Sequence, residues 1–217
     1  MEVLEIIRSR HSVRQYTDKR IEDDKREVLN ALARECNKKS GLNIQIIYDE
    51  PRCFKAFFSK VAKFKNCANY ISIVGKKSDP DLDEKAGYYG EQLVLKAQEL
   101  GLNTCWVGFT HGKGVAKVET DEKQVIIIAL GYGANQGVAH KNKSISEISN
   151  ISNNMPQWYA SGVEAALLAP TATNQQRFHI ELKEESAKIT AENKSFAFID
   201  LGIVKYHFEA ASGHKCE

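Results

Sequence analysis

The chain has 217 residues, of which 42% are hydrophobic and 27% are charged. This composition predicts a folded protein with a sizeable core and excludes a mainly disordered chain. The length favours one large domain over residues 1–217. Thirty Lys and Arg residues against 28 Asp and Glu residues give a net charge of +2, which argues against a nucleic-acid partner.

Other features of the sequence indicate where in the cell the protein is expected to be found. The longest apolar run, Val125–Leu130, is far shorter than the roughly 20 residues that span a bilayer, so no membrane partner is expected. The N-terminus carries acids where a signal peptide carries bases. The five cysteines are odd in number and form no C-x-x-C pair. We therefore expect a cytoplasmic protein with reduced thiols and no metal site.

The first half of the chain alternates predicted helices and strands. Apolar periodicity and turn residues predict a helix at 2–8 and a second helix that follows Thr17-Asp18 and ends at Gly41. Strands are expected at 42–48 and at 70–74, and Gly75 should stop the latter. A helix at 83–100, capped by Gly101, an extended segment at 104–109 and a buried strand at 124–130 complete this half.

The second half begins with a polar stretch, residues 134–155, which we expect to be a long surface connection. A helix at 157–168 follows and stops at Pro170. We then expect strands at 178–182 and 197–199 and a helix at 202–212. The alternation of helices and strands predicts an α/β or α+β protein.

A weak internal repeat relates two parts of the sequence. Leu32-Ala33 and the alternating residues after them match Leu168-Ala169 and the strand after them, at an offset of 136 residues. The segments 90–101 and 202–213 also resemble each other. Two related halves explain these matches, and so does chance similarity between amphipathic helices.

A basic stretch at Arg8–Tyr16 is the first candidate binding site. Its arginines offer planar pairs of donors to phosphate oxygens, and its serines add hydroxyl groups. A solvated basic turn between two helices is the alternative explanation.

A polar loop at Ala169–Gln176 is the second candidate. Its Asn and Gln amides can both donate and accept hydrogen bonds, which suits a flavin ring or a nucleobase. A capped turn is the alternative, because Thr and Asn favour turns.

Two further stretches are weaker candidates. In the segment 101–108, Gly108 would let a flat ligand approach the backbone, although Trp106 alone is more often a core residue. Lys141 and Lys143 could neutralise a phosphate, but a solvated lysine pair is the default explanation.

Taken together, these stretches resemble the FMN-dependent nitroreductase family. The resemblance rests on R-x-R-H-S-V-R-Q-Y at 8–16, G-L-N-T-C-W-V-G at 101–108, A-L-G-Y-G at 129–133 and A-P-T-A-T-N-Q-Q at 169–176. The last motif normally follows the N-terminal arginines closely, whereas here it lies near the C-terminus. The chain therefore resembles a subgroup in which two half-domains are fused into a single-chain pseudo-dimer. The resemblance implies an α+β fold with an antiparallel or mixed central sheet flanked by helices, with halves at 1–135 and 156–217 joined by a connector at 136–155.

The resemblance also implies which residues bind the cofactor. Arg10, His11 and Ser12 would hold the phosphate and ribityl chain of FMN, with Lys141 and Lys143 adding charge, and Arg14 would lie near the pyrimidine side of the ring. The ring would further contact Pro170, Thr171, Ala172 and Asn174, while Trp106, Val107 and Gly108 would line its N5 side. Ala172 lacks a hydroxyl often found there, and Arg177-Phe178 replaces the Pro-Trp of the family.

The activity that the resemblance implies is a ping-pong oxidoreductase reaction with no catalytic side chain. NADH or NADPH would reduce FMN, and a nitroaromatic, quinone or similar small molecule would accept the electrons. The fused chain could be a monomer or a homodimer. A flavin-binding protein without efficient turnover, acting as a sensor or flavin store, is one alternative, and a pseudoenzyme that has lost FMN is another.

Overall fold

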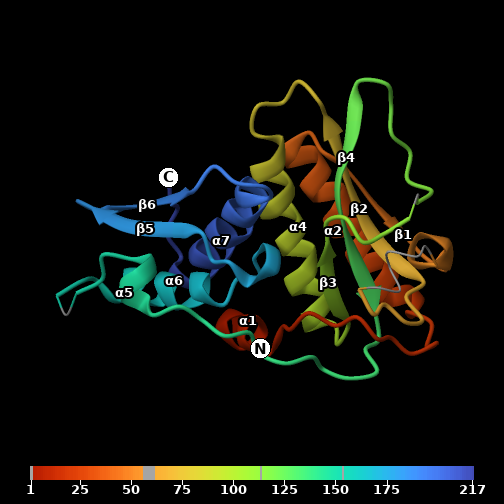
Figure 1. Ribbon diagram of the computed structural model, residues 1–217, viewed down its shortest axis with the longest axis horizontal. Helices are drawn as coiled ribbons and strands as arrows, with labels where there is room; N and C mark the ends of the chain where they lie inside the picture. Colours follow the sequence, from red (N-terminus) through yellow and green to blue (C-terminus); the bar gives the residue numbers. More distant parts are fainter. Residues whose placement is uncertain (1, 56–61, 113, 153) are drawn as a thin grey trace. The chain divides into compact units, whose positions relative to one another are not determined.

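The protein is described here by a computed structural model covering residues 2–55, 62–112, 114–152 and 154–217. The chain forms two compact units, neither of which is continuous in sequence. We call residues Arg10–Leu82 and Leu93–Val138 the sheet unit, and residues up to Ser9, Asp83–Gln92 and Ala139–Glu217 the helical unit. Figure 1 shows their elements coloured along the sequence. The grouping differs from the predicted halves, which remain a prediction about how the chain is organised.

The sheet unit is built on four antiparallel strands. Their order is β1 (Asn43–Ile47), β2 (Asn69–Lys76), β4 (Glu122–Gly131) and β3 (Asn103–Val107). Strand β2 is buried except at Lys76, and β4 is buried from Ile126 to Gly131, in keeping with their continuous apolar runs. Helix α2 (Asp23–Ser40) contacts β1 and turns Leu29, Ala33 and Cys36 inward, as its periodicity predicts. In Figure 1 it lies against the sheet. A short 3-10 helix, η1, spans Pro51–Phe54. The predicted α+β fold with a helix-flanked central sheet is confirmed.

One predicted strand end is wrong, and the cause is a glycine. Strand β2 does not stop at Gly75 but continues to Lys76. A Cβ atom at Gly75 would lie only 2.4 Å from Leu82 Cδ1 and 2.9 Å from Leu42 Cδ2. The glycine therefore makes room for these leucines on the face of the strand and does not end it.

The helical unit combines helices with a β-hairpin. Its elements are α1 (Val3–Ser9), the first part of α4 (Leu82–Glu99), α5 (Ile145–Ile148), α6 (Gln157–Leu167), the 3-10 helix η2 (Ala172–Asn174), the antiparallel strands β5 (Phe178–Lys183) and β6 (Ser186–Ala191), and α7 (Ala197–Ser212). Figure 1 shows α6 and α7 side by side. None of the helices in the described part of the chain has both the length and the apolar character needed to cross a membrane.

Glycines let the helices of this unit approach closely. A Cβ atom at Gly87 of α4 would lie 2.0 Å from the backbone oxygen of Ile199, and one at Gly202 of α7 would lie 2.0 Å from that of Glu84. No larger residue fits at either position without moving the backbone. Buried polar groups add to the contact: His207 Nε2 lies 2.8 Å from Glu91 Oε1, and both side chains are fully buried.

The structure corrects the predicted elements at the end of the chain. Ala197–Ile199 forms the first turn of α7 and not a strand, so this helix begins before the predicted residue 202. The second strand of the hairpin is β6, which buries only Ala187 and Ile189 and so gave little hydrophobic signal. The polar connector also contains a helix, α5, which Ser144 and Glu147 start with a capping box.

Candidate functional site

The basic stretch of the sheet unit lies beside strand β3 in an extended conformation. Ser12 forms a parallel bridge with Thr104, and Val13 N–H donates to the Thr104 carbonyl at 3.0 Å. On the other side, Lys65 N–H donates to the Arg14 carbonyl at 3.0 Å. Val13 and Tyr16 are buried in the core. Backbone hydrogen bonds and two apolar anchors therefore hold the stretch, which is not a solvated turn.

Positive charge gathers where this stretch meets β3. Arg10 is only 3% exposed, whereas Arg14 is exposed and makes no ion pair with any residue that the structure describes. Burial raises the pKa of the Cys105 thiol, and Arg14, a hydrogen bond from Ser12 and Arg10 act against that rise. The positive charge of both arginines is thus felt at Cys105 of β3.

The predicted ring-facing residues lie at the end of the same strand. The Val107 side chain is 2% exposed and belongs to the core, so it could offer a ligand only its backbone. Trp106 and Gly108 are partly exposed. His11 lies on the turn at Gly137, where a Cβ atom would come 2.8 Å from His11 Cβ. The structure therefore places Arg10–Arg14 alongside β3, the strand that leads to Trp106 and Val107, within the sheet unit.

The predicted residues of the helical unit form a second group. The Lys141 carbonyl accepts from Asn174 Nδ2 at 2.8 Å and from Gln176 Nε2 at 2.9 Å. Lys143 donates its backbone N–H to Gln176 Oε1 at 2.9 Å and its Nζ to the Gln176 carbonyl at 2.8 Å. The lysine pair and the polar loop are thus joined, largely through Gln176, which is 2% exposed. The sequence places this glutamine in the candidate loop but does not single it out as the residue that holds the loop.

The loop of the helical unit has an unusual backbone. Thr173, Asn174 and Gln176 have φ angles of 50°, 56° and 47°, a left-handed conformation that costs roughly 1 kcal/mol or more for each residue other than glycine. Several contacts hold it, including Gln176 N–H to Thr171 Oγ1 at 3.0 Å. Pro170 is buried, while Thr171 and Ala172 are partly exposed.

Asp200, on the first turn of α7, also holds this loop and was missed from the sequence. Both of its carboxylate oxygens lie 3.0 Å from the backbone nitrogen of Ala172. Burial raises the pKa of Asp200 to about 7, and the Ala172 N–H opposes that rise. Asp200 is the sole charged residue in the apolar run Ala197–Val204, and that isolation could have marked it in the sequence.

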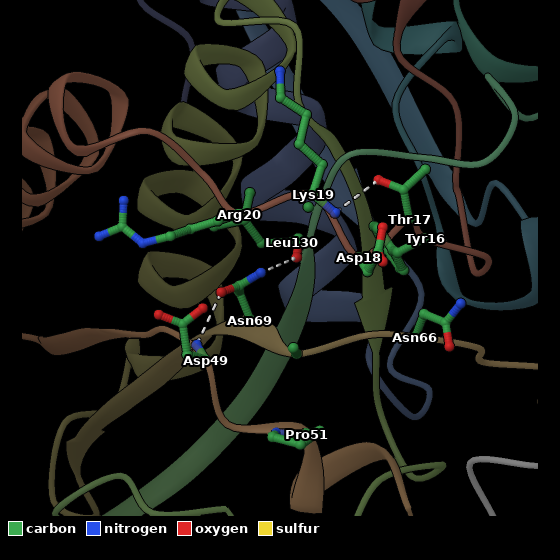
Figure 2. Close-up of a pocket in the computed structure, with 12 residues that line it drawn as sticks. Tyr16, Thr17, Asp18, Lys19, Arg20, Asp49, Pro51, Asn66, Asn69 and Leu130 are labelled. Carbon is green, nitrogen blue, oxygen red and sulfur yellow. Dashed lines mark hydrogen bonds between the residues drawn. The ribbon is translucent and has the colours of Figure 1, made fainter.

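Figure 2 shows a cavity of about 290 Å³ in the sheet unit. None of the predicted cofactor-binding residues lines it. Three of its charged side chains pair with residues outside the lining: Lys19 with Glu22 at 2.8 Å, Arg20 with Asp23 at 2.5 Å and Asp49 with Arg26 at 2.9 Å. Its lining comprises Tyr16, Thr17, Asp18, Lys19, Arg20, Asp49, Pro51, Asn66, Ala68, Asn69, Leu130 and Gly131. Charged side chains that are already paired offer a ligand little electrostatic attraction.

A cavity of about 340 Å³ in the helical unit includes a predicted residue, Lys143. Gln176, Phe178 and Glu192 also line it. Among the described residues, no group of three or more His, Cys, Asp or Glu side chains is placed to hold a metal ion.

Known structures share this arrangement of elements. A "putative nitroreductase" from Thermotoga maritima MSB8 aligns with a TM-score of 0.71 at 22% identity, over 97% of this chain and 83% of that chain. An FMN-dependent nitroreductase from Clostridium difficile R20291 aligns with a TM-score of 0.54 at 20% identity, over 70% and 99% of the two chains. A "putative nitroreductase" from Desulfovibrio desulfuricans in complex with FMN aligns with a TM-score of 0.54 at 19% identity, over 71% and 98%. The fold is therefore that of the nitroreductases.

The family assignment is more specific than the fold. A family model described as "Putative TM nitroreductase" matches residues 2–212, so the chain belongs to that nitroreductase family. No curated protein matches the sequence.

Proposed function

We propose that the protein is an FMN-dependent oxidoreductase of the nitroreductase type. The observation that carries this proposal is the position of the segment Arg10–Arg14, which backbone contacts at Ser12 and Val13 hold beside β3, in a chain of the nitroreductase family. A phosphate group needs strong, charged hydrogen-bond donors, and the arginines of this segment supply them. The FMN named in two of the neighbouring structures supports the same ligand class.

The proposed roles follow from the chemistry of each group. Arg10, His11 and Ser12 would bind the phosphate and the ribityl chain. The exposed guanidinium of Arg14 would stabilise negative charge that the ring gains on reduction. Trp106 and the backbone of Val107 and Gly108 would line the ring.

The helical unit would add further contacts to FMN. Lys141 and Lys143 would contribute charge near the phosphate, and the loop from Pro170 to Asn174 would contact the ring. The amide of Asn174 already bonds within the loop, so we expect it to fix the loop shape as well.

Bound FMN supplies the two-electron redox chemistry, and we assign no catalytic side chain. NADH or NADPH is the proposed donor, a nitroaromatic, quinone or similar small molecule the proposed acceptor, and the cytoplasm the proposed location. The roles of the chain's own residues are to bind the cofactor, orient it and supply a positive potential.

We also propose that the two halves of the chain are related as a fused pseudo-dimer. The elements α2, β1, β2 and α4 recur in the same order as α6, β5, β6 and α7, which supports this proposal. Such a chain could be a monomer or a homodimer.

The test is the absorption spectrum of the purified protein after FMN is added and unbound FMN removed. Flavin bands that bleach with NADH or NADPH under nitrogen are the expected result. Bands that resist bleaching would instead indicate a flavin-binding protein without turnover, and the failure to retain FMN would indicate a pseudoenzyme.

A further inference from the structure

We propose that Asp200 is a positioning residue, which holds the loop Pro170–Gln176 in the conformation that binds FMN by accepting the Ala172 N–H. The inference rests on the proposed function for its FMN-dependent part. The part about the loop can be tested without any cofactor.

The geometry of Asp200 is that of a cap supplied by another element. Ala172 is the first residue of η2, so its N–H has no partner within that helix. The preceding residue, Thr171, is the N-cap, but its hydroxyl accepts from Gln176 N–H and makes no cap contact. An N-cap side chain reaches the second or third N–H of a helix and not the first, so the Ala172 N–H depends on Asp200, both of whose carboxylate oxygens lie 3.0 Å from the Ala172 nitrogen.

The loop requires such a contact because its backbone is strained. The left-handed residues Thr173, Asn174 and Gln176 follow directly after the capped N–H. Such conformations persist where surrounding contacts over-determine them. On one side the loop is bonded to Lys141 and Lys143 through Asn174 and Gln176, and at its start it is bonded to α7 through Asp200. Removing the second attachment would leave the first turn of the loop free to relax.

Making this contact with a carboxylate requires that the charged group be removed from water, which costs free energy. Asp200 is largely buried, and burial is what raises its pKa to about 7. Within the described chain, no charged group from α6, α7 or the loop contributes to that shift, and the Ala172 N–H is what opposes it. An ionised acceptor makes the stronger hydrogen bond. The position therefore gains a firm hold on the loop at the cost of burying charge, and protonation of the acid removes that cost.

The experiment compares Asp200→Ala, Asp200→Asn and the matched control Glu185→Ala, at an exposed acid in the β5–β6 turn. Hydrogen-exchange protection factors of residues 171–176 are measured without FMN, and FMN affinity is measured by titration. Asp200→Ala should lower the protection factors and weaken FMN binding, each by at least about tenfold, because a hydrogen bond to a charged group is lost. Asp200→Asn retains an acceptor oxygen and should restore most of both.

A pH series guards against a variant that fails to fold. In the wild type, protection of the loop should rise as the pH drops from 8 to 6, because opening of the loop brings Asp200 into water, where its pKa is lower, and protonation therefore favours the closed loop. Asp200→Asn should show no such change. Equal protection and affinity in Asp200→Ala and the wild type would overturn the proposal, as would lost protection with unchanged FMN affinity. If the wild type binds no FMN, the proposed function fails, and the protection factors still decide whether Asp200 holds the loop.

Discussion

The two segments predicted to bind FMN are held in different ways. In the sheet unit, Arg10–Tyr16 is fixed by backbone hydrogen bonds to β3 and Lys65 and by buried Val13 and Tyr16. In the helical unit, the loop at 170–176 is fixed mainly by side chains, above all Gln176 and Asp200, around a left-handed backbone. The first segment should therefore tolerate changes to its outward side chains without losing its shape. The second should lose its shape when a single polar side chain is removed.

The core of the helical unit also contains a buried pair of polar side chains. The helical unit includes His207 and Glu91, buried side by side. Because His207 Nδ1 lies 3.0 Å from the Ala165 carbonyl, which can only accept, that nitrogen carries a proton.

The largest effect is expected from His207→Ala. The substitution leaves Glu91 buried without its partner, and breaking a buried pair in this way costs about 3–5 kcal/mol of the free energy of unfolding. Urea denaturation measures the loss. His179→Ala, at an exposed position of β5, is the control and should change stability by less than about 0.5 kcal/mol. Similar small losses for both variants would show that polar contacts do not hold the helical unit.

Gln176→Ala should have the next largest effect. It removes the side-chain bonds to Lys141, Lys143 and Asn174, and several lost bonds of about 1 kcal/mol each should cost about 2–3 kcal/mol in stability. The neighbouring Gln175 is exposed, and its amide bonds only to Thr173 among the described contacts, so Gln175→Ala is a matched control. If the two variants unfold at the same urea concentration, the loop is not held by Gln176.

The sequence predicted the sheet unit better than the side-chain contacts that hold the loop of the helical unit. Apolar runs such as Val125–Leu130 predicted the sheet, because burial on both faces requires them. The loop motif indicated a ligand site and contained Gln176, but it did not show that Gln176 holds the loop, and Asp200 was missed. Their importance comes from contacts with residues about 30 positions away, such as Lys143 and Ala172, which no local pattern contains. Strand β6 was missed because its buried residues are few and small.

Arg10→Ala should weaken FMN binding while leaving the fold of its segment intact. Loss of a charge-assisted hydrogen bond to the phosphate corresponds to about 1.5–3 kcal/mol of binding free energy. Arg8→Ala, which removes an exposed arginine paired with Glu164, should leave affinity almost unchanged. Fluorescence titration with FMN gives both affinities. An unchanged FMN affinity in Arg10→Ala would show that Arg10 does not bind the phosphate and that its segment has only a structural role.

Arg14→Gln should have the smallest effect, and its dependence on salt separates it from Arg10. Arg14 is exposed, so its attraction for an anionic flavin should contribute only about 0.2–1 kcal/mol and should be screened as ionic strength rises. Arg10 is 3% exposed, and its contribution should persist in salt. FMN affinities of both variants at low and high ionic strength test this, with Arg34→Gln, an exposed arginine on α2 paired with Glu27, as the control. A salt-insensitive loss in Arg14→Gln would mean that Arg14 bonds the ligand directly in a site closed to water, because only a contact removed from solvent escapes screening.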